Sequence, residues 1–302
     1  MGIDAATLEI LLTAREAGVS FDEVLTVGRQ SLCASPTEVK TVLARHGIRL
    51  TGVETQKLVS EQNGYCEPLL KLMGAQRVDS LDVSNFEGAS IVHDMNEVLP
   101  DSYRNQFTIV IDGGSLEHVF NFPVALRNCM DAVAPGGHFI GITPSNNLMG
   151  HGFYQFSPEL FFRVFTPDNG FRIEKVLIYE CPWGSVWYEV MDPEEAKRRV
   201  NLTNRRPAYL IVWAKKTASV PIFSQWPQQS DYVALWQRSA FDDTADAGFT
   251  PSWYRSFLIR HAPRWANSLY RTVRPFRSQL FKKVRVPNRR EPLTAAEVSP
   301  TP

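Results

Sequence analysis

The segment Phe107-Thr-Ile-Val-Ile-Asp112-Gly-Gly-Ser-Leu-Glu117-His118 begins with five apolar or β-branched residues and continues into an aspartate and two glycines. Such a run, bounded by turn residues, predicts a buried strand. Six further runs of this kind occur, at residues 23–28, 77–83, 89–94, 137–143, 171–179 and 208–214. Stretches with helical signals lie between many of them, at residues 3–17, 35–47, 65–73, 121–134 and 157–165. Alternating strands and helices predict a doubly wound α/β fold, with a seven-stranded, mostly parallel sheet and helices on both faces.

The regular alternation ends near residue 216, and this sets the predicted domain boundaries. We expect a Rossmann-like α/β domain over residues 1–216, with a polar insertion at 183–206. A helical, basic and aromatic extension should follow at residues 217–290. The Pro-containing residues 291–302 are expected to form a disordered tail.

Polar residues follow four of the predicted strands, at the positions where open α/β sheets bind ligands. They are Gly28-Arg29-Gln30, Asp82, Asp94 and Asp112-Gly113-Gly114. A single aspartate at such a position often only caps a helix or starts a turn. Three carboxylates at the same edge of one sheet favour a binding site instead.

At these residues the chain resembles the class I S-adenosylmethionine (SAM)-dependent methyltransferases. The stretch Val110–Val119 is similar to the fourth motif of that family, in which an aspartate ending strand four precedes Leu-Glu-His-Val. Ala134-Pro-Gly-Gly137 is similar to its Pro-Gly-Gly turn, although Val133-Ala134 replaces the usual Leu-Lys. Phe156–Leu160 and Asn169-Gly-Phe171 match its late helix and the Gly-Phe before strand six. The resemblance covers roughly residues 22–215.

The resemblance implies a SAM cofactor and assigns residues to it by position. In the family, an acid ending strand two holds the ribose hydroxyls, and an acid after strand three meets the adenine amino group. These acids correspond to Asp82 and Asp94. The complete set of cofactor-binding residues expected here is Gly28, Arg29, Asp82, Asp94, Asp112 and Gly113.

The first motif departs from the family pattern. Methyltransferases carry a glycine-rich loop after strand one, whereas Val27-Gly-Arg-Gln-Ser-Leu-Cys33 contains a single glycine. This segment also lacks the G-x-G-x-x-G pattern of nicotinamide-binding proteins. Two interpretations follow. Either the cofactor sits differently, with Gly28 and Arg29 near its carboxylate, or the site has lost its cofactor. Arg29 suits a carboxylate because its planar guanidinium group donates two parallel hydrogen bonds; the alternative for Arg29 is a surface cation in a loop.

Three residues are candidates for catalysis on a methyl acceptor: His118, His151 and Tyr154. Methyl transfer requires alignment of the nucleophile and, for a hydroxyl acceptor, removal of its proton. His118 could serve as that base or could support the loop. His151 and Tyr154 belong to a glycine- and aromatic-rich segment, Gly150–Phe156, which would either close over a substrate or pack on the sheet edge.

The leading functional hypothesis is therefore a SAM-dependent methyltransferase acting on a small molecule or on a cell-envelope glycan or lipid precursor. The first alternative is a non-catalytic binding or scaffold protein that has lost SAM. The second is a different enzyme on the same scaffold, because fold does not fix function. The sequence leaves the acceptor and the oligomeric state open.

The distribution of charge and the spacing of the cysteines indicate partners and location. Residues 251–290 contain eleven Lys or Arg and no Asp or Glu, interleaved with aromatic residues. This composition favours an anionic membrane surface as partner, with RNA as the weaker candidate and packing on the acidic body as the alternative. The N-terminal residues show no export signal, and the four cysteines form no C-x-x-C pair. We therefore expect a cytoplasmic protein, peripheral at the inner face of the membrane, without disulfides or a bound metal.

Overall fold

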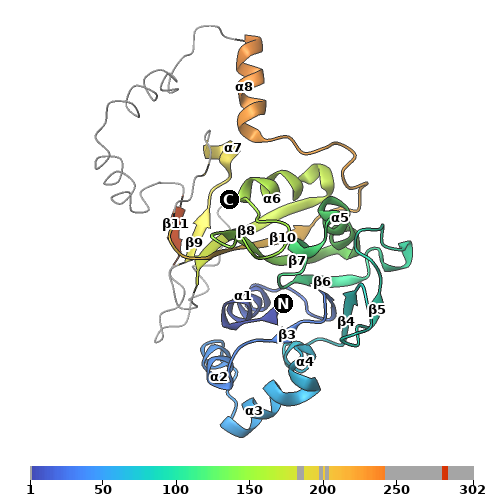
Figure 1. The fold of residues 1–302 in the computed structure, drawn as a ribbon, viewed down its shortest axis with the longest axis vertical. Coiled ribbons are helices and arrows are strands. Elements are labelled where there is room, and N and C mark those ends of the chain that lie inside the picture. The colour runs from blue at the N-terminus through green and yellow to red at the C-terminus, as the bar shows by residue number, and fades with distance from the viewer. Residues whose placement is uncertain (1, 182–186, 197–199, 201–203, 242–280, 285–302) are drawn as a thin grey trace, which may run out of the picture.

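The computed structural model describes residues 2–181, 187–196, 200, 204–241 and 281–284 (Figure 1). The described strands include a nine-stranded sheet in the order β11-β9-β8-β10-β7-β6-β2-β4-β5. From the β5 edge to the β11 edge, the strands are β5 (Ile91–Val92), β4 (Arg77–Asp82), β2 (Glu23–Val27), β6 (Phe107–Asp112), β7 (Val133–Asn146), β10 (Ala208–Lys216), β8 (Phe171–Glu180), β9 (Trp187–Val190) and β11 (Phe281–Val284).

All seven predicted strands are present, so the doubly wound α/β prediction is confirmed. The five strands from β5 to β7 pair in parallel, and β10 lies antiparallel between β7 and β8. The count of seven was wrong for the described chain, because β9 and β11 add antiparallel strands beyond β8. The predicted insertion at 183–206 thus contains a strand, β9. The predicted strand at 89–94 is short, because only two residues of β5 pair with β4.

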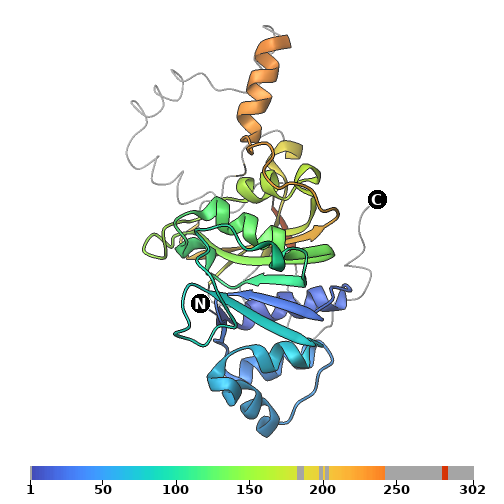
Figure 2. The same cartoon turned by 90° about the vertical axis from the view of Figure 1, so that its right-hand side faces the viewer.

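Helices cover both faces of the sheet, as predicted (Figures 1 and 2). The described α-helices are α1 (Ala5–Glu16), α2 (Pro36–Arg45), α3 (Gly52–Ser60), α4 (Glu67–Leu72), α5 (Phe122–Ala132), α6 (Pro158–Val164), α7 (Pro193–Ala196) and α8 (Ser230–Phe241). Side chains of α1, α2 and α4 share one hydrophobic cluster, and side chains of α5 and α6 share the other. Successive residues of a strand pack in alternate clusters: Ile109 and Ile111 of β6 belong to the first cluster, and Val110 belongs to the second. This period of two is what burial on both faces of a strand requires.

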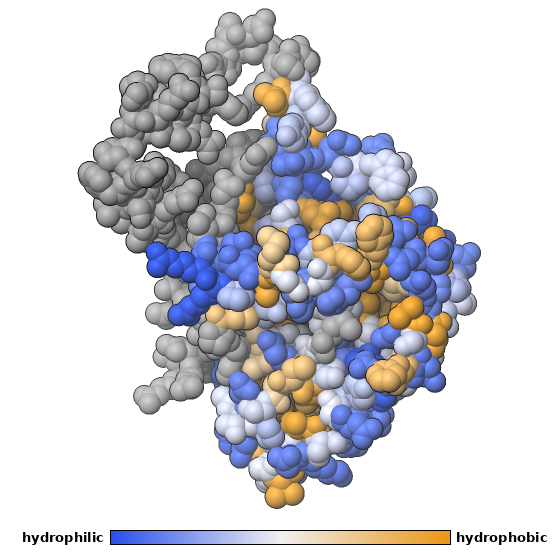
Figure 3. Space-filling view, in the orientation of Figure 1, coloured by the Kyte–Doolittle hydropathy of each residue, from blue (hydrophilic) through white to orange (hydrophobic). Residues whose placement is uncertain are grey.

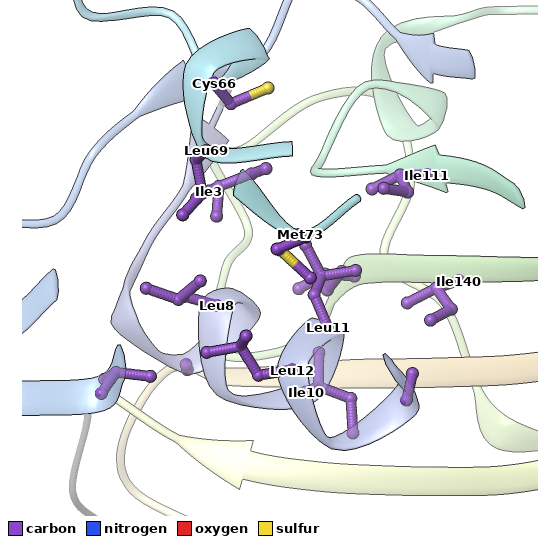
Figure 4. Packing of buried hydrophobic residues seen from close by; sticks show 14 of the residues in the cluster. Ile3, Leu8, Ile10, Leu11, Leu12, Cys66, Leu69, Met73, Ile111 and Ile140 are labelled. Atoms are coloured by element: carbon purple, nitrogen blue, oxygen red, sulfur yellow. The ribbon is translucent and has the colours of Figure 1, made fainter. Parts of the chain in front are cut away.

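Helix α1 is among the most buried helices, because nine of its twelve residues have little or no exposed surface. Figure 4 shows side chains from α1, α4, β6 and β7 gathered in the first cluster, together with Ile3. On the face drawn in Figure 3, by contrast, hydrophobic residues are interspersed with hydrophilic ones. Helix α1 is therefore part of the core of this domain and covers the same sheet face as α2 and α4.

A two-stranded parallel sheet stands where the family places its glycine-rich loop. After β2, residues Ser31–Leu32 (β3) pair with Gly2–Ile3 (β1) near the N-terminus. The amide of Gly2 also donates a hydrogen bond of 3.3 Å to the carbonyl of Gly113, which follows β6. The N-terminal segment is thereby fastened to the carboxyl edge of the main sheet.

The basic segment at 251–290 lies outside the described residues, apart from the four residues of β11. The described part of the predicted extension at 217–290 contains α8 and β11, so the domain boundaries in this region stay a prediction. In the part of the chain that is described, none of the helices has the length and apolar character needed to cross a bilayer.

Candidate functional site

The candidate site lies at the carboxyl ends of β2 and β6, where the strand order reverses. From β2 the chain proceeds outward to β4 and β5 on one side, and then returns to β6 and β7 on the other. In doubly wound sheets this reversal leaves a crevice that binds the ligand. The loops after these strands, Gly28–Gln30 and Gly113–His118, therefore decide what the site can hold.

The side chain of Gln30 fills the space between these two loops. It is fully buried, and its amide Nε2 donates to the carbonyl of Val27 and, over 3.1 Å, to Oγ of Ser115. The Ser115 hydroxyl in turn donates to the same Val27 carbonyl at 2.6 Å. A Cβ atom on Gly113 would come within 2.5 Å of Oε1 of Gln30. Gly113, predicted to contact the cofactor, is thus required here to accommodate Gln30.

Arg29 spans the neighbouring gap, between the ends of β2 and β4. Its Nε donates to Glu67 at 2.6 Å, and Nη1 donates to the carbonyl of Glu87 at 2.8 Å. The guanidinium carbon lies 4.1 Å from the centre of the Tyr65 ring, a cation–π distance. Only 18% of the Arg29 side chain is exposed. Arg29 is therefore an internally paired residue in this structure and not a free surface cation; whether it contacts a cofactor stays a prediction.

Asp82 and Asp94 lie at the carboxyl ends of β4 and β5, the edge at which the sequence placed them. Asp82 is half-buried, and its Oδ1 accepts a 3.2 Å hydrogen bond from the amide of Ser84. Asp94 is exposed and accepts hydrogen bonds from the amide and side chain of Asn96. These bonds lower the pKa of Asp94. Gly28, at φ 71°, donates to Leu81 over 2.7 Å and so links the ends of β2 and β4.

Two carboxyl groups, Asp112 and Glu117, are buried where β6 ends, and neither has an exposed side chain. Asp112 accepts a 2.8 Å hydrogen bond from the amide of Ser115 through Oδ1, whereas Oδ2 has no hydrogen-bond partner. Neither carboxylate oxygen of Glu117 has one. Burial raises the pKa of Asp112 to about 7 and, together with the charge of Asp112, raises the pKa of Glu117 to about 8.

Two histidines converge on Glu117 from different loops. His118 belongs to the same short helix, η3 (Leu116–His118), and His151 to the loop after β7. Nε2 of His151 lies 3.3 Å from Oε1 of Glu117, and the two imidazole rings have centroids 5.2 Å apart. Partial burial and the neighbouring His151 lower the pKa of His118, which favours the neutral ring that can accept a proton.

Backbone contacts hold the loop after β7 against Glu117. The amide of Phe153 donates to the Glu117 carbonyl at 2.8 Å. Gly152 adopts φ 74°, and a Cβ there would lie 2.8 Å from the backbone carbonyl oxygen of Glu117 and 2.9 Å from the Cγ atom of Glu117. Since only glycine fits such a left-handed, closely packed position, Gly152 fixes the placement of His151.

Tyr154 occupies a different environment from the two histidines. Its hydroxyl donates a 2.6 Å hydrogen bond to the carbonyl of Phe120, and its ring packs on Phe122 and Phe156. This arrangement agrees with the alternative in which the aromatic part of the loop packs on the sheet edge. The structure thus brings His118 and His151 together and engages the Tyr154 hydroxyl elsewhere.

Gln30 and Glu117 are the site residues to which the sequence analysis assigned no role. Glu117 was part of the fourth motif, but its burial beside Asp112 depends on the path of η3. Gln30 was visible only as a residue following the single glycine of the first loop. Neither residue carries a local pattern that distinguishes a buried polar side chain from an exposed one.

Comparisons with known proteins give structural neighbours only. No family model matches the chain, and no curated protein matches it. A SAM-dependent methyltransferase from Mesorhizobium loti matches at a TM-score of 0.37 and 16% identity, covering 70% of this chain and 97% of its own. The N-methyltransferase NodS from Bradyrhizobium japonicum matches at a TM-score of 0.33 and 12% identity, and the match covers 68% of this chain and 93% of NodS. The branched-chain polyamine synthase from Thermus thermophilus matches at a TM-score of 0.35 and 12% identity, and the match covers 75% of this chain and 61% of the synthase.

The chain has a doubly wound, Rossmann-like α/β fold, with the antiparallel strand β10 between β7 and β8. The segments that resemble methyltransferase motifs lie at the carboxyl ends of β4 and β6, whereas the segment after β2 departs from the family pattern. At such identities and TM-scores, the neighbours themselves carry no conclusion about activity, cofactor or acceptor.

Proposed function

We propose that this protein is a SAM-dependent methyltransferase acting on a small molecule or on a cell-envelope glycan or lipid precursor. The observation that carries the proposal is the position of Asp82 and the Asp112–His118 segment. They flank the switch point of the sheet, at the edge where this fold binds ligands. In this proposal Asp82 holds the ribose hydroxyls of the cofactor, and Asp94 lies nearer to the adenine.

The acceptor would bind beside the two histidines. Methyl transfer is an in-line displacement at the sulfonium methyl group, so the protein must mainly align the acceptor and exclude water. A neutral His118 is suited to take the proton of an acceptor hydroxyl. Next to it, the exposed rings of Phe120 and Phe153 lie 5.8 Å apart, and Met149 is also exposed. These apolar side chains favour an acceptor that has an apolar portion as well as a polar reacting group.

Calorimetric titration with SAM and with its demethylated product, S-adenosylhomocysteine, tests the proposal. We expect micromolar affinity for the wild type. Replacing Asp82→Ala should weaken binding by about 1–3 kcal/mol, because the ribose hydroxyls lose a charged acceptor. Asp101→Ala is the matched control, since this exposed acid precedes β6 at the opposite edge of the sheet. Absence of heat and of a thermal shift at millimolar cofactor would contradict the proposal.

A second candidate is a non-catalytic protein of this fold, and the first loop favours it. Gln30 fills the switch-point crevice, and Arg29 is paired across the adjacent gap. A cofactor must displace or rearrange Gln30 to lie between the ends of β2 and β6, or Arg29 to lie between the ends of β2 and β4. If Gln30→Ala binds SAM measurably while the wild type does not, the crevice is closed by this side chain and the scaffold interpretation holds for the natural protein.

A further inference from the structure

The cluster formed by Glu117, His118 and His151 has the composition of a metal site. One donor atom from each of these residues lies within 4.8 Å of the other two. Two ligands that each lie about 2.1 Å from one ion are at most about 4.2 Å apart. A small rotation of the two histidine side chains, which lie partly in solvent, therefore brings all three donors within bonding distance of a common centre.

The environment of the Glu117 side chain also indicates a ligand. Its side chain is fully buried, yet both carboxylate oxygens lack a hydrogen-bond partner, and Oε1 faces Nε2 of His151. Burying a carboxyl group without hydrogen bonds is costly, and such a group takes up a proton, pairs with a cation or coordinates a metal. Gly152 packs closely against Glu117, and this contact holds the neighbouring His151 beside the carboxyl group.

We propose that Glu117, His118 and His151 bind one divalent transition-metal ion at the carboxyl edge of β6. Two imidazoles and one carboxylate suit zinc, cobalt, manganese or iron, whereas calcium and magnesium favour oxygen ligands throughout. Three protein ligands would leave coordination positions open, and both histidines are exposed, so solvent reaches this cluster. An oxygen of an acceptor molecule is the chemical group suited to such a position. With the ion bound, His118 is a ligand and no longer the proton acceptor named under the proposed function.

This proposal differs from the expectation of no metal that the cysteine spacing gave. The cysteine spacing bears only on sites with thiolate ligands. The ligands proposed here are a glutamate and two histidines, and His151 lies more than thirty residues after the other two in the sequence. The site shares no residue with the set assigned to the cofactor. It can therefore be tested without a methyl donor.

The experiment is a titration of chelator-treated protein with Zn²⁺ by calorimetry and with Co²⁺ by visible absorption. We expect one equivalent to bind to the wild type, and Mg²⁺ to give no comparable signal. Glu117→Gln, His118→Ala and His151→Ala should each weaken binding by at least about tenfold, since loss of a second-shell partner alone can cost that much. Thermal melts establish that each variant is folded, and both histidines are exposed enough to be replaced without loss of the core.

Two controls separate this site from adventitious binding. His93→Ala removes a histidine of the β5 edge, and Cys33→Ser removes an exposed thiol. Both should bind Zn²⁺ like the wild type. The proposal is overturned if the wild type binds no stoichiometric ion, or if the three ligand variants bind as tightly as the controls. A positive result here together with no SAM binding would sustain the metal site and reject the proposed methyl transfer.

Discussion

Asp112 and Glu117 place two carboxyl groups in the interior of the domain, five residues apart at the end of β6. Burial disfavours the charged form of both groups, and the charge of Asp112 further opposes ionisation of Glu117. The folded protein therefore holds protons that the unfolded chain releases at much lower pH. The ordinary pKa values of Asp and Glu, about 3.9 and 4.3, describe that unfolded chain.

This difference predicts the pH dependence of stability. As pH rises from about 4, the unfolded chain loses these protons first, whereas the folded protein keeps them until about pH 7 to 8. The unfolded state then binds fewer protons, so the free energy of unfolding falls with rising pH through this window. Glu117→Gln removes one of the two buried titrating groups. We expect a flatter profile from urea unfolding in the presence of chelator.

Glu97→Gln serves as the control, because Glu97 is exposed and its replacement leaves both buried groups in place. Its profile should match that of the wild type. If Glu117→Gln retains the full slope of the wild type between pH 4 and 8, then Glu117 does not hold a proton in the folded protein, and the environment assigned to it is wrong.

At the residue scale, the sequence predicted positions better than environments. The edge location of Asp82, Asp94 and Asp112 follows from strand ends and is confirmed. Burial of Gln30 is not predictable in this way, because it depends on the path that β3 takes toward Gly2–Ile3. The convergence of His118 and His151 likewise depends on how two distant loops pack.

The loop after β7 is the element on which the histidine pair depends. Gly152→Ala introduces a side chain at a left-handed backbone position, within 2.9 Å of Glu117. We expect the loop to shift, with a loss of roughly 1–3 kcal/mol of stability and weaker Zn²⁺ binding. Gly150→Ala is the matched control in the same loop, because a Cβ there meets no heavy atom within 4 Å. Equal stability and equal ion affinity for the two variants would refute the proposed docking of the loop.

At the scale of elements, predictions succeeded where a local signal coincides with burial. Ser35-Pro36 begins α2 as expected, and Ser35 and Glu38 form a complete capping box. Thr51 and Glu54 form the same box at the start of α3, which was not predicted although the signal is present in the sequence. Strand β9 could not be predicted, because its residues gain their place by pairing with β8 and β11.

At the scale of the whole molecule, the charge is unevenly distributed along the chain. The total is zero, and residues 251–290 contribute eleven positive charges, so the remainder carries eleven negative ones. The prediction of an anionic membrane partner rests on this sequence alone. In flotation assays we expect the full chain to bind anionic but not neutral vesicles, since each engaged cation contributes on the order of 1 kcal/mol. Deletion of residues 251–302 should abolish binding. Equal indifference to both vesicle types would instead favour packing of the segment on the body.

A crystal structure of the protein with S-adenosylhomocysteine would show whether the carboxyl edge of β2, β4 and β6 binds the cofactor. We expect the ligand at this edge, with its ribose hydroxyls within hydrogen-bond distance, about 2.6–3.2 Å, of Asp82. Gln30 or Arg29 should have moved from the contacts described above. A ligand bound elsewhere, or a crystal grown at saturating ligand that shows Gln30 still bonded to Ser115 and an empty edge, would contradict this expectation.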